Sequence, residues 1–248
     1  MIVAFSNHKG GAAKTTSVIN IGGALRQLKK KVLLVDIDPQ SNLTKGLGIR
    51  QFCPQNIYGA LSGRYSLPII TTEEGIDIVP STLDLAGAER ELYQVKDYNN
   101  LLNRLLDPFK NKYDYIIIDC PPNLGILTAN ALAASQYVII PVDAGYFALD
   151  GLTKLIEVIN IVKKNSNPKL EIGAVISTKF DSRKSLDNEI SNSLSNEFKE
   201  KVLHTKIRNN VSLGEAQAVG TSIFSYKKNS LGAKDYMSVT KELIKILK

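Results

Sequence analysis

The stretch "HKGGAAKTTSVIN" (residues 8–20) decides the fold, because it places two glycines and two lysines between an apolar segment and an amphipathic one. The residues before it, "MIVAFS" (1–6), have the character of a buried strand, and residues 15–29 have the spacing of a helix. A glycine turn from strand to helix exposes backbone N–H groups at the positive end of a helix dipole. The pattern therefore predicts a cradle for phosphate groups after the first strand.

Further apolar runs along the chain predict an α/β fold. They are short, rich in valine and isoleucine and apolar on both faces, which is typical of parallel strands covered on both sides. The expected strands after the first are 31–37, 76–80, 113–120, 136–142 and 170–178. Helical patterns accompany them at about 83–94, 98–107, 124–134, 148–164, 184–200 and 233–247. We expect one domain, residues 1–248, with a doubly wound, mostly parallel sheet and helices on both faces.

Composition and charge narrow the functional classes. The 248 residues are 44% hydrophobic, with no long apolar run and no signal-peptide pattern, so we expect a cytoplasmic protein without membrane association. The net charge of +7 lies entirely in residues 151–248, which hold 17 Lys and Arg against 10 Asp and Glu. Such an asymmetry is typical of a face that meets a polyanion. A lysine-rich solvated surface explains the charge equally well, so both interpretations stay open.

Polar turns follow several of the predicted strands. "DIDPQSN" (36–42), "DCPPN" (119–123) and "PVDAGYFALDG" (141–151) come directly after apolar runs, as the glycine turn does. Ligands of open parallel sheets bind at the carboxyl ends of the strands, where these turns would meet. The sequence thus predicts one site built from four turns.

The roles of the glycine turn follow from charge. We expect Lys14 against the β- and γ-phosphates, Thr15 on Mg²⁺ through its hydroxyl, and the N–H groups of residues 11–16 around phosphate oxygens. A turn that only packs a helix on a strand would not need two lysines and two threonines. The nucleotide-binding residues that these arguments predict in this stretch are Gly10, Gly11, Ala12, Ala13, Lys14, Thr15 and Thr16, whereas Lys9 lies too early to serve its own cradle easily.

The letters "KGGAAKTT" (9–16) resemble the deviant Walker A motif, KGGxxK[ST][ST], of the ParA/MinD group of P-loop ATPases. In that family glycine usually stands before the second lysine, where this chain has Ala13. The resemblance implies that ATP and Mg²⁺ are the cofactors. It also implies that Lys9 reaches the partner's nucleotide in a homodimer that encloses two ATP molecules.

Two carboxylate-bearing segments complete the resemblance. Asp36 and Asp38 share one face at the end of the second strand. This segment resembles the family's switch I, in which the position of Asp38 is implicated in hydrolysis, whereas Asp36 is either a second functional carboxylate or the cap of a neighbouring helix. "YDYIIIDCPPNLG" (113–125) resembles Walker B and switch II, which implies that Asp119 holds the metal. The expected metal-site residues are Thr15, Asp38 and Asp119.

The likeness covers nearly the whole chain and is closest to the ParA/Soj branch. The end of the chain, "DYMSVTKELIKILK" (235–248), lacks the aromatic wedge of a MinD-type membrane helix, and the two cysteines do not match the cluster ligands of NifH-type proteins. "KIRNNVSLGEAQAVG" (206–220) resembles the family segment that borders the adenine. The resemblance therefore assigns Asn210 and Arg208 to the base, although Arg208 stands where the family has proline.

The function that this resemblance implies is partition of a chromosome or plasmid by a nucleoid-associated ATPase. The ATP-bound dimer would bind double-stranded DNA non-specifically, and a ParB-like protein would stimulate slow hydrolysis. Two other classes remain: an ATP-switched cargo-positioning adaptor without a DNA role, and a metabolic ligase, which would need an acid or base set that the sequence does not show. The predicted DNA-binding residues are Lys179, Arg183, Lys184, Lys206, Lys227 and Lys228.

Replacing Lys14 with alanine should abolish ATP binding, because the loop would lose the cation that faces the β- and γ-phosphates. An equilibrium titration with a fluorescent ATP analogue measures the affinity. Tight binding by the variant would contradict the assignment of the phosphate loop.

Overall fold

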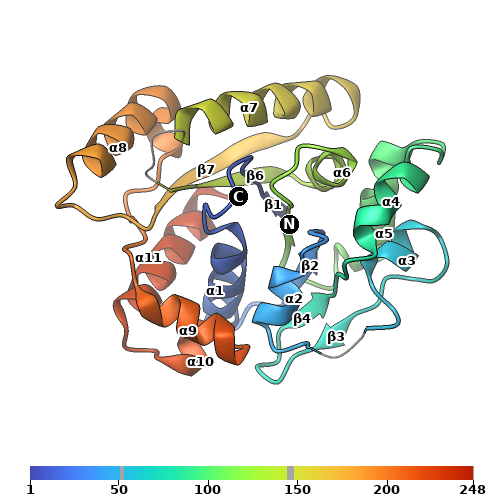
Figure 1. Ribbon diagram of the computed structural model, residues 1–248, viewed down its shortest axis with the longest axis horizontal. Helices are drawn as coiled ribbons and strands as arrows, with labels where there is room; N and C mark the ends of the chain where they lie inside the picture. Colours follow the sequence, from blue (N-terminus) through green and yellow to red (C-terminus); the bar gives the residue numbers. More distant parts are fainter. Residues whose placement is uncertain (51–52, 144–147, 248) are drawn as a thin grey trace.

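The computed structural model describes residues 1–50, 53–143 and 148–247 of the chain (Figure 1). Its strands form one seven-stranded sheet in the order β3-β4-β2-β5-β1-β6-β7. The expected parallel arrangement is confirmed, with β3 as an antiparallel edge strand beside β4. The strands are β1 (Ile2–Phe5), β2 (Val32–Asp36), β3 (Ile70–Thr71), β4 (Asp77–Val79), β5 (Tyr115–Asp119), β6 (Tyr137–Asp143) and β7 (Glu171–Thr178).

Seven helices lie where the sequence predicts them. They are α1 (Lys14–Gln27), α4 (Leu85–Leu92), α5 (Leu101–Leu106), α6 (Ile126–Ala134), α7 (Ala148–Asn165), α8 (Ser185–Phe198) and α11 (Leu231–Ile246). Short 3-10 turns η1 (Tyr98–Asn100) and η2 (Asp107–Phe109) flank α5, and η3 (Lys199–Lys201) follows α8. In the described part of the chain, no helix combines the length and the apolar character needed to cross a bilayer.

Four helices were not predicted: α2 (Asn42–Gly46), α3 (Ile57–Leu61), α9 (Val211–Val219) and α10 (Ile223–Tyr226). Three of them have only four or five residues, which is too short to display a helical period. The fourth, α9, exposes an apolar residue at each end, Val211 and Val219, so its sequence shows no clear buried stripe.

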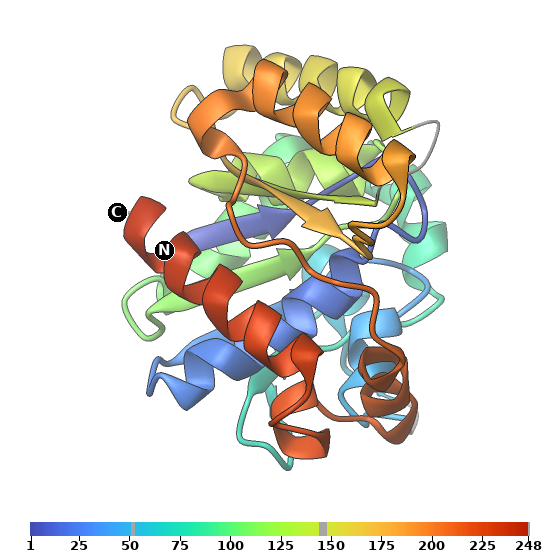
Figure 2. The same ribbon diagram turned by 90° about the vertical axis from the view of Figure 1, so that its left-hand side faces the viewer.

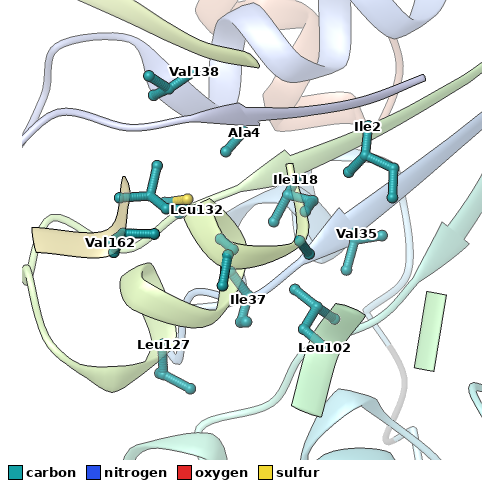
Figure 3. Close-up of a cluster of buried hydrophobic side chains, with 14 of the residues drawn as sticks. Ile2, Ala4, Val35, Ile37, Leu102, Ile118, Leu127, Leu132, Val138 and Val162 are labelled. Carbon is teal, nitrogen blue, oxygen red and sulfur yellow. The ribbon is translucent and has the colours of Figure 1, made fainter. Parts of the chain in front are cut away.

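The sheet separates two apolar cores. Alternate residues of β1 divide between them, because Ile2 and Ala4 face the first core whereas Val3 and Phe5 face the second. The first core (Figure 3) lies between the sheet and helices α3 to α8. The second lies between the sheet and α1, α2, α9, α10 and α11. Figure 2 shows α7 and α8 on one side of the sheet and α1 and α11 on the other.

The strand register brings three strand ends together. In the centre of the sheet β5 lies between β1 and β2, and Asp119 is opposite both Phe5 and Asp36. The glycine turn that follows β1 therefore lies beside the carboxylates that end β2 and β5. Residues 144–147, in the predicted polar turn 141–151, lie outside the described residues.

Candidate functional site

The glycine turn bends through two residues in the left-handed region of backbone conformation. Gly11 has a φ of 75°, and Ala13, directly before α1, has a φ of 61°. Glycine adopts this conformation freely, whereas alanine has a steric cost of about 1–2 kcal/mol. No acidic residue lies in the first turn of α1, so its N-terminal N–H groups and positive dipole end remain available to an anion.

Lys14 carries a buried positive charge into this turn. The residue is only 7% exposed, and its ammonium donates to the carbonyl oxygens of Asn7 at 3.1 Å and Lys9 at 3.4 Å. Burial lowers the pKa of Lys14, and the nearby carboxyl group of Asp119 acts in the opposite direction. The ammonium of Lys14 is thus bonded to the backbone of its own turn, which places the cation close to the N–H groups of the loop.

Asp119 and Thr15 form the second part of the site. Asp119 is fully buried, and the hydroxyl of Thr15 donates to its Oδ2 at 2.7 Å. Its other oxygen, Oδ1, is buried without a hydrogen-bond partner in the part of the chain that the structure describes. Burial raises the pKa of Asp119 well above its usual range. Hydroxyl and carboxylate oxygens are the kind of ligand that Mg²⁺ binds, so Thr15 and Asp119 fit that ion.

The two aspartates at the end of β2 have different roles. Asp36 is fully buried and accepts from the N–H of Thr44 at 2.9 Å, the hydroxyl of Thr44 at 2.6 Å and the N–H of Asp38 at 3.1 Å. Because Thr44 lies in the first turn of α2, Asp36 is the helix-capping carboxylate, one of the two interpretations that the sequence left open. Burial raises the pKa of Asp36 to about 7.

Asp38, in contrast, lines a cavity of about 630 Å³ above the glycine turn. One of its carboxylate oxygens accepts from the N–H of Gln40 at 2.9 Å, and Ser81 donates to its carbonyl at 2.8 Å. The segment after β2 is therefore held in place while the carboxylate faces the cavity. The predicted residues that line this cavity are Gly10, Gly11, Ala13, Lys14, Thr15, Thr16, Asp38 and Lys179.

Sequence reasoning missed the opposite wall of the cavity. Gln217 accepts from the hydroxyl of Thr16 at 3.2 Å, and the guanidinium of Arg50 donates to the carbonyl of Ala218. These contacts connect α9 with α1 and with the segment after α2. The sequence carries no local signal for this wall, because the position of Gln217 at the cavity depends on a contact between residues 201 positions apart.

Other predicted residues lie away from the lining. Arg208 makes an ion pair with the buried Asp235 of α11, and Asn210 accepts from the N–H of Ser212 as the cap of α9. Neither borders the cavity above the glycine turn. Ala12 is buried, and its carbonyl accepts from Thr178 at 3.2 Å. Lys9 also lies off the lining, and its ammonium has no partner among the described residues.

The predicted DNA-binding residues do not form one group. Lys179 pairs with Asp143 at 3.4 Å beside the glycine turn. Arg183 and Lys206 border a second cavity of about 580 Å³, which Arg208 also lines. The ammonium of Lys206 lies 4.0 Å from the centre of the Phe180 ring. Lys184 precedes α8, and Lys227 and Lys228 are exposed after α10.

The fold and the site together define a P-loop nucleotide-binding protein. A family model described as an AAA domain matches residues 1–172. The sporulation initiation inhibitor protein Soj of Bacillus subtilis strain 168 is 44% identical over 246 residues, which cover 98% of this chain and 97% of that relative. The chromosome-partitioning ATPase Soj of Treponema pallidum is 40% identical, with coverage of 97% and 95%. The chain belongs to the ParA/Soj family of partition ATPases.

Solved structures resemble the chain over nearly its whole length. A cobyrinic acid a,c-diamide synthase from Mycobacterium smegmatis with bound ATP analogue and magnesium has a TM-score of 0.87 and 32% identity, with coverage of 98% of this chain and 94% of that one. A putative plasmid partition protein from Borrelia burgdorferi bound to AMPPNP has a TM-score of 0.81 and 29% identity, with coverage of 99% and 97%. Their ligands agree with the ATP and Mg²⁺ that the sequence predicts.

Replacing Ala13 with glycine should stabilise the free protein by about 1 kcal/mol, because glycine avoids the cost of the left-handed conformation. Urea unfolding without nucleotide measures the change. The matched control is Ala12→Gly, since Ala12 is 1% exposed and has no positive φ. This second change should destabilise the protein by about 1 kcal/mol, and equal effects of the two substitutions would contradict the conformation of the loop.

Proposed function

We propose that this protein is a partition ATPase that binds ATP with Mg²⁺, dimerises, binds double-stranded DNA without sequence preference, and is released by hydrolysis. The observation that carries the proposal is the group formed by Lys14, Thr15 and Asp119, in which a buried cation lies beside a buried carboxylate with one unsatisfied oxygen. A triphosphate with a divalent cation would complement both. The membership of the Soj/ParA family supports the rest of the cycle.

The residues of the site have separable tasks in this proposal. Lys14 and the N–H groups of residues 11–16 bind phosphate oxygens. Thr15 and Asp119 would hold Mg²⁺, which supplies neutralisation of phosphate charge when it is bound. Asp38 faces the cavity on a fixed turn and orients the attacking water. Phosphoryl transfer depends mostly on positioning and electrostatics, which this site supplies. The sequence motifs place no histidine or glutamate as a strong general base, which fits slow hydrolysis.

Dimerisation is proposed to depend on Lys9. Lys9 directly precedes the exposed Gly10 and Gly11, and its charge has no partner in residues 1–50, 53–143 and 148–247. In a dimer whose glycine turns face one another, Lys9 would contact the nucleotide of the partner. Two nucleotides would then be enclosed, and dissociation would follow their hydrolysis.

DNA binding is proposed for the basic residues of the last 98 positions. Arg183 and Lys206 lie at one cavity, and Lys227 and Lys228 are exposed after α10. Contacts with phosphates need positive charge more than one particular side chain, so binding should be non-specific and weakened by salt. The proposal includes a nucleoid location and a ParB-like partner that stimulates hydrolysis. The assignment of Arg208 and Asn210 to the adenine rests on the family resemblance.

The cargo-positioning adaptor remains the second candidate because three of the predicted basic residues are not free. Arg183 and Lys179 are engaged with Asp181 and Asp143, and Lys206 lies over a ring. A gel shift with random-sequence duplex and ATP over a salt series separates the candidates. A salt-dependent shift supports the partition function, and its absence at low salt supports the adaptor.

Replacing Asp38 with alanine should lower the hydrolysis rate at least about tenfold while ATP still binds, because the water would lose its orienting carboxylate. The variant should therefore remain as an ATP-bound dimer on DNA. Phosphate release and co-sedimentation with DNA, measured on the same samples, test this expectation. Hydrolysis at the rate of the unmodified protein would refute the role of Asp38.

A further inference from the structure

The three residues before the glycines form a turn that is held at both ends. The side chain of Asn7 donates to the carbonyl of Pro141 in β6 at 2.7 Å and accepts from the N–H of Lys9 at 2.9 Å. The carbonyls of Asn7 and Lys9 both accept from the ammonium of Lys14. The backbone of Lys9 is therefore fixed on the side of β6 and on the side of the phosphate loop.

His8 supplies a third attachment, to the segment after β5. Its Nδ1 lies 3.1 Å from the carbonyl oxygen of Pro122, and because a carbonyl only accepts, Nδ1 carries the proton. Pro122 itself lines the cavity above the glycine turn. The half-buried His8 ring thus connects the turn that presents Lys9 with the wall of the nucleotide cavity.

We propose that His8 is a positioning residue, which sets the direction of Lys9 and couples it to the segment after Asp119. The inference rests on the proposed function, because it concerns the lysine that would cross to the second subunit. His8 contacts neither phosphate nor metal in this scheme. Its hydrogen bond with Pro122 keeps the Lys9 turn and the cavity wall in one fixed relation, so a change in either one is transmitted to the other.

The geometry explains why a histidine side chain suits this place. Among the described residues, the donor that reaches the carbonyl of Pro122 is the side chain of His8. The donor atom of His8, Nδ1, is bonded to Cγ, and the amide nitrogen of an asparagine occupies the equivalent position. A leucine has similar size but no donor. Substitution by asparagine or leucine therefore separates the hydrogen bond from the space that the ring fills.

The test compares His8→Leu, His8→Asn and Lys9→Ala in the full-length chain. Light scattering measures dimerisation with ATP and Mg²⁺, and steady-state kinetics give kcat and KM. His8→Leu should weaken dimerisation and lower kcat about fivefold to tenfold with KM within twofold, because the phosphate loop still binds ATP. His8→Asn, which keeps a donor at the same position, should restore most of the dimerisation and of kcat. If His8 only filled space, asparagine would restore neither better than leucine does.

The matched control is His204→Ala, since the backbone N–H of that second histidine, and not its ring, makes its hydrogen bond with Glu242. This variant should dimerise as the unmodified protein does. If Lys9→Ala loses dimerisation but His8→Leu does not, the proposal for His8 is overturned and the proposed function stands. If Lys9→Ala dimerises normally, the proposed role of Lys9 in dimerisation fails, and the role of His8 fails with it.

Discussion

The structure depends on the burial of one cation and three carboxylates at adjacent strand ends. Lys14, Asp36, Asp38 and Asp119 are all less than a tenth exposed, and charges removed from water are costly unless they are paired and hydrogen-bonded. The carboxylates differ in how many hydrogen-bond donors the surrounding residues provide to them. Among the described residues, Asp36 has three donors, whereas Asp119 has one donor and an oxygen without a partner. A ligand that brings both negative oxygens and a divalent cation would complete the group.

The sheet provides the precision that this arrangement needs. Parallel pairing puts Asp119 opposite Phe5 and Asp36. The glycine turn that follows β1 therefore lies directly beside the carboxylates at the ends of β5 and β2. The turn then adopts a left-handed conformation at Ala13, with α1 starting at the next residue. Strain of this kind is kept at functional sites when the surrounding structure fixes it. Beside Ala13, the carbonyl of Ala12 accepts a hydrogen bond from Thr178, and the start of the turn is bonded to β6 and to the segment after β5 through Asn7 and His8.

The sequence was sufficient to locate the contiguous parts of the cavity lining. Residues 9–16 stand together in one motif, and Asp119 ends the apolar strand β5, whereas Asp38 lies two residues after the end of β2. The cavity wall formed by Arg50 and Gln217 could not be predicted, since it depends on contacts between distant segments. The capping role of Asp36 depended on α2, which is too short to have a visible period. The ion pair of Arg208 with Asp235 likewise joins residues from separate elements.

The most direct measurement of the central claim is a calorimetric titration with a non-hydrolysable ATP analogue, performed with Mg²⁺ and with a chelator, on the unmodified protein and on Asp119→Asn. If the buried group is completed by a triphosphate and a metal together, the unmodified protein should bind at least about tenfold more tightly with Mg²⁺. The substitution should remove most of that difference. Equal affinity with and without Mg²⁺, or an unchanged difference in the variant, would contradict the account.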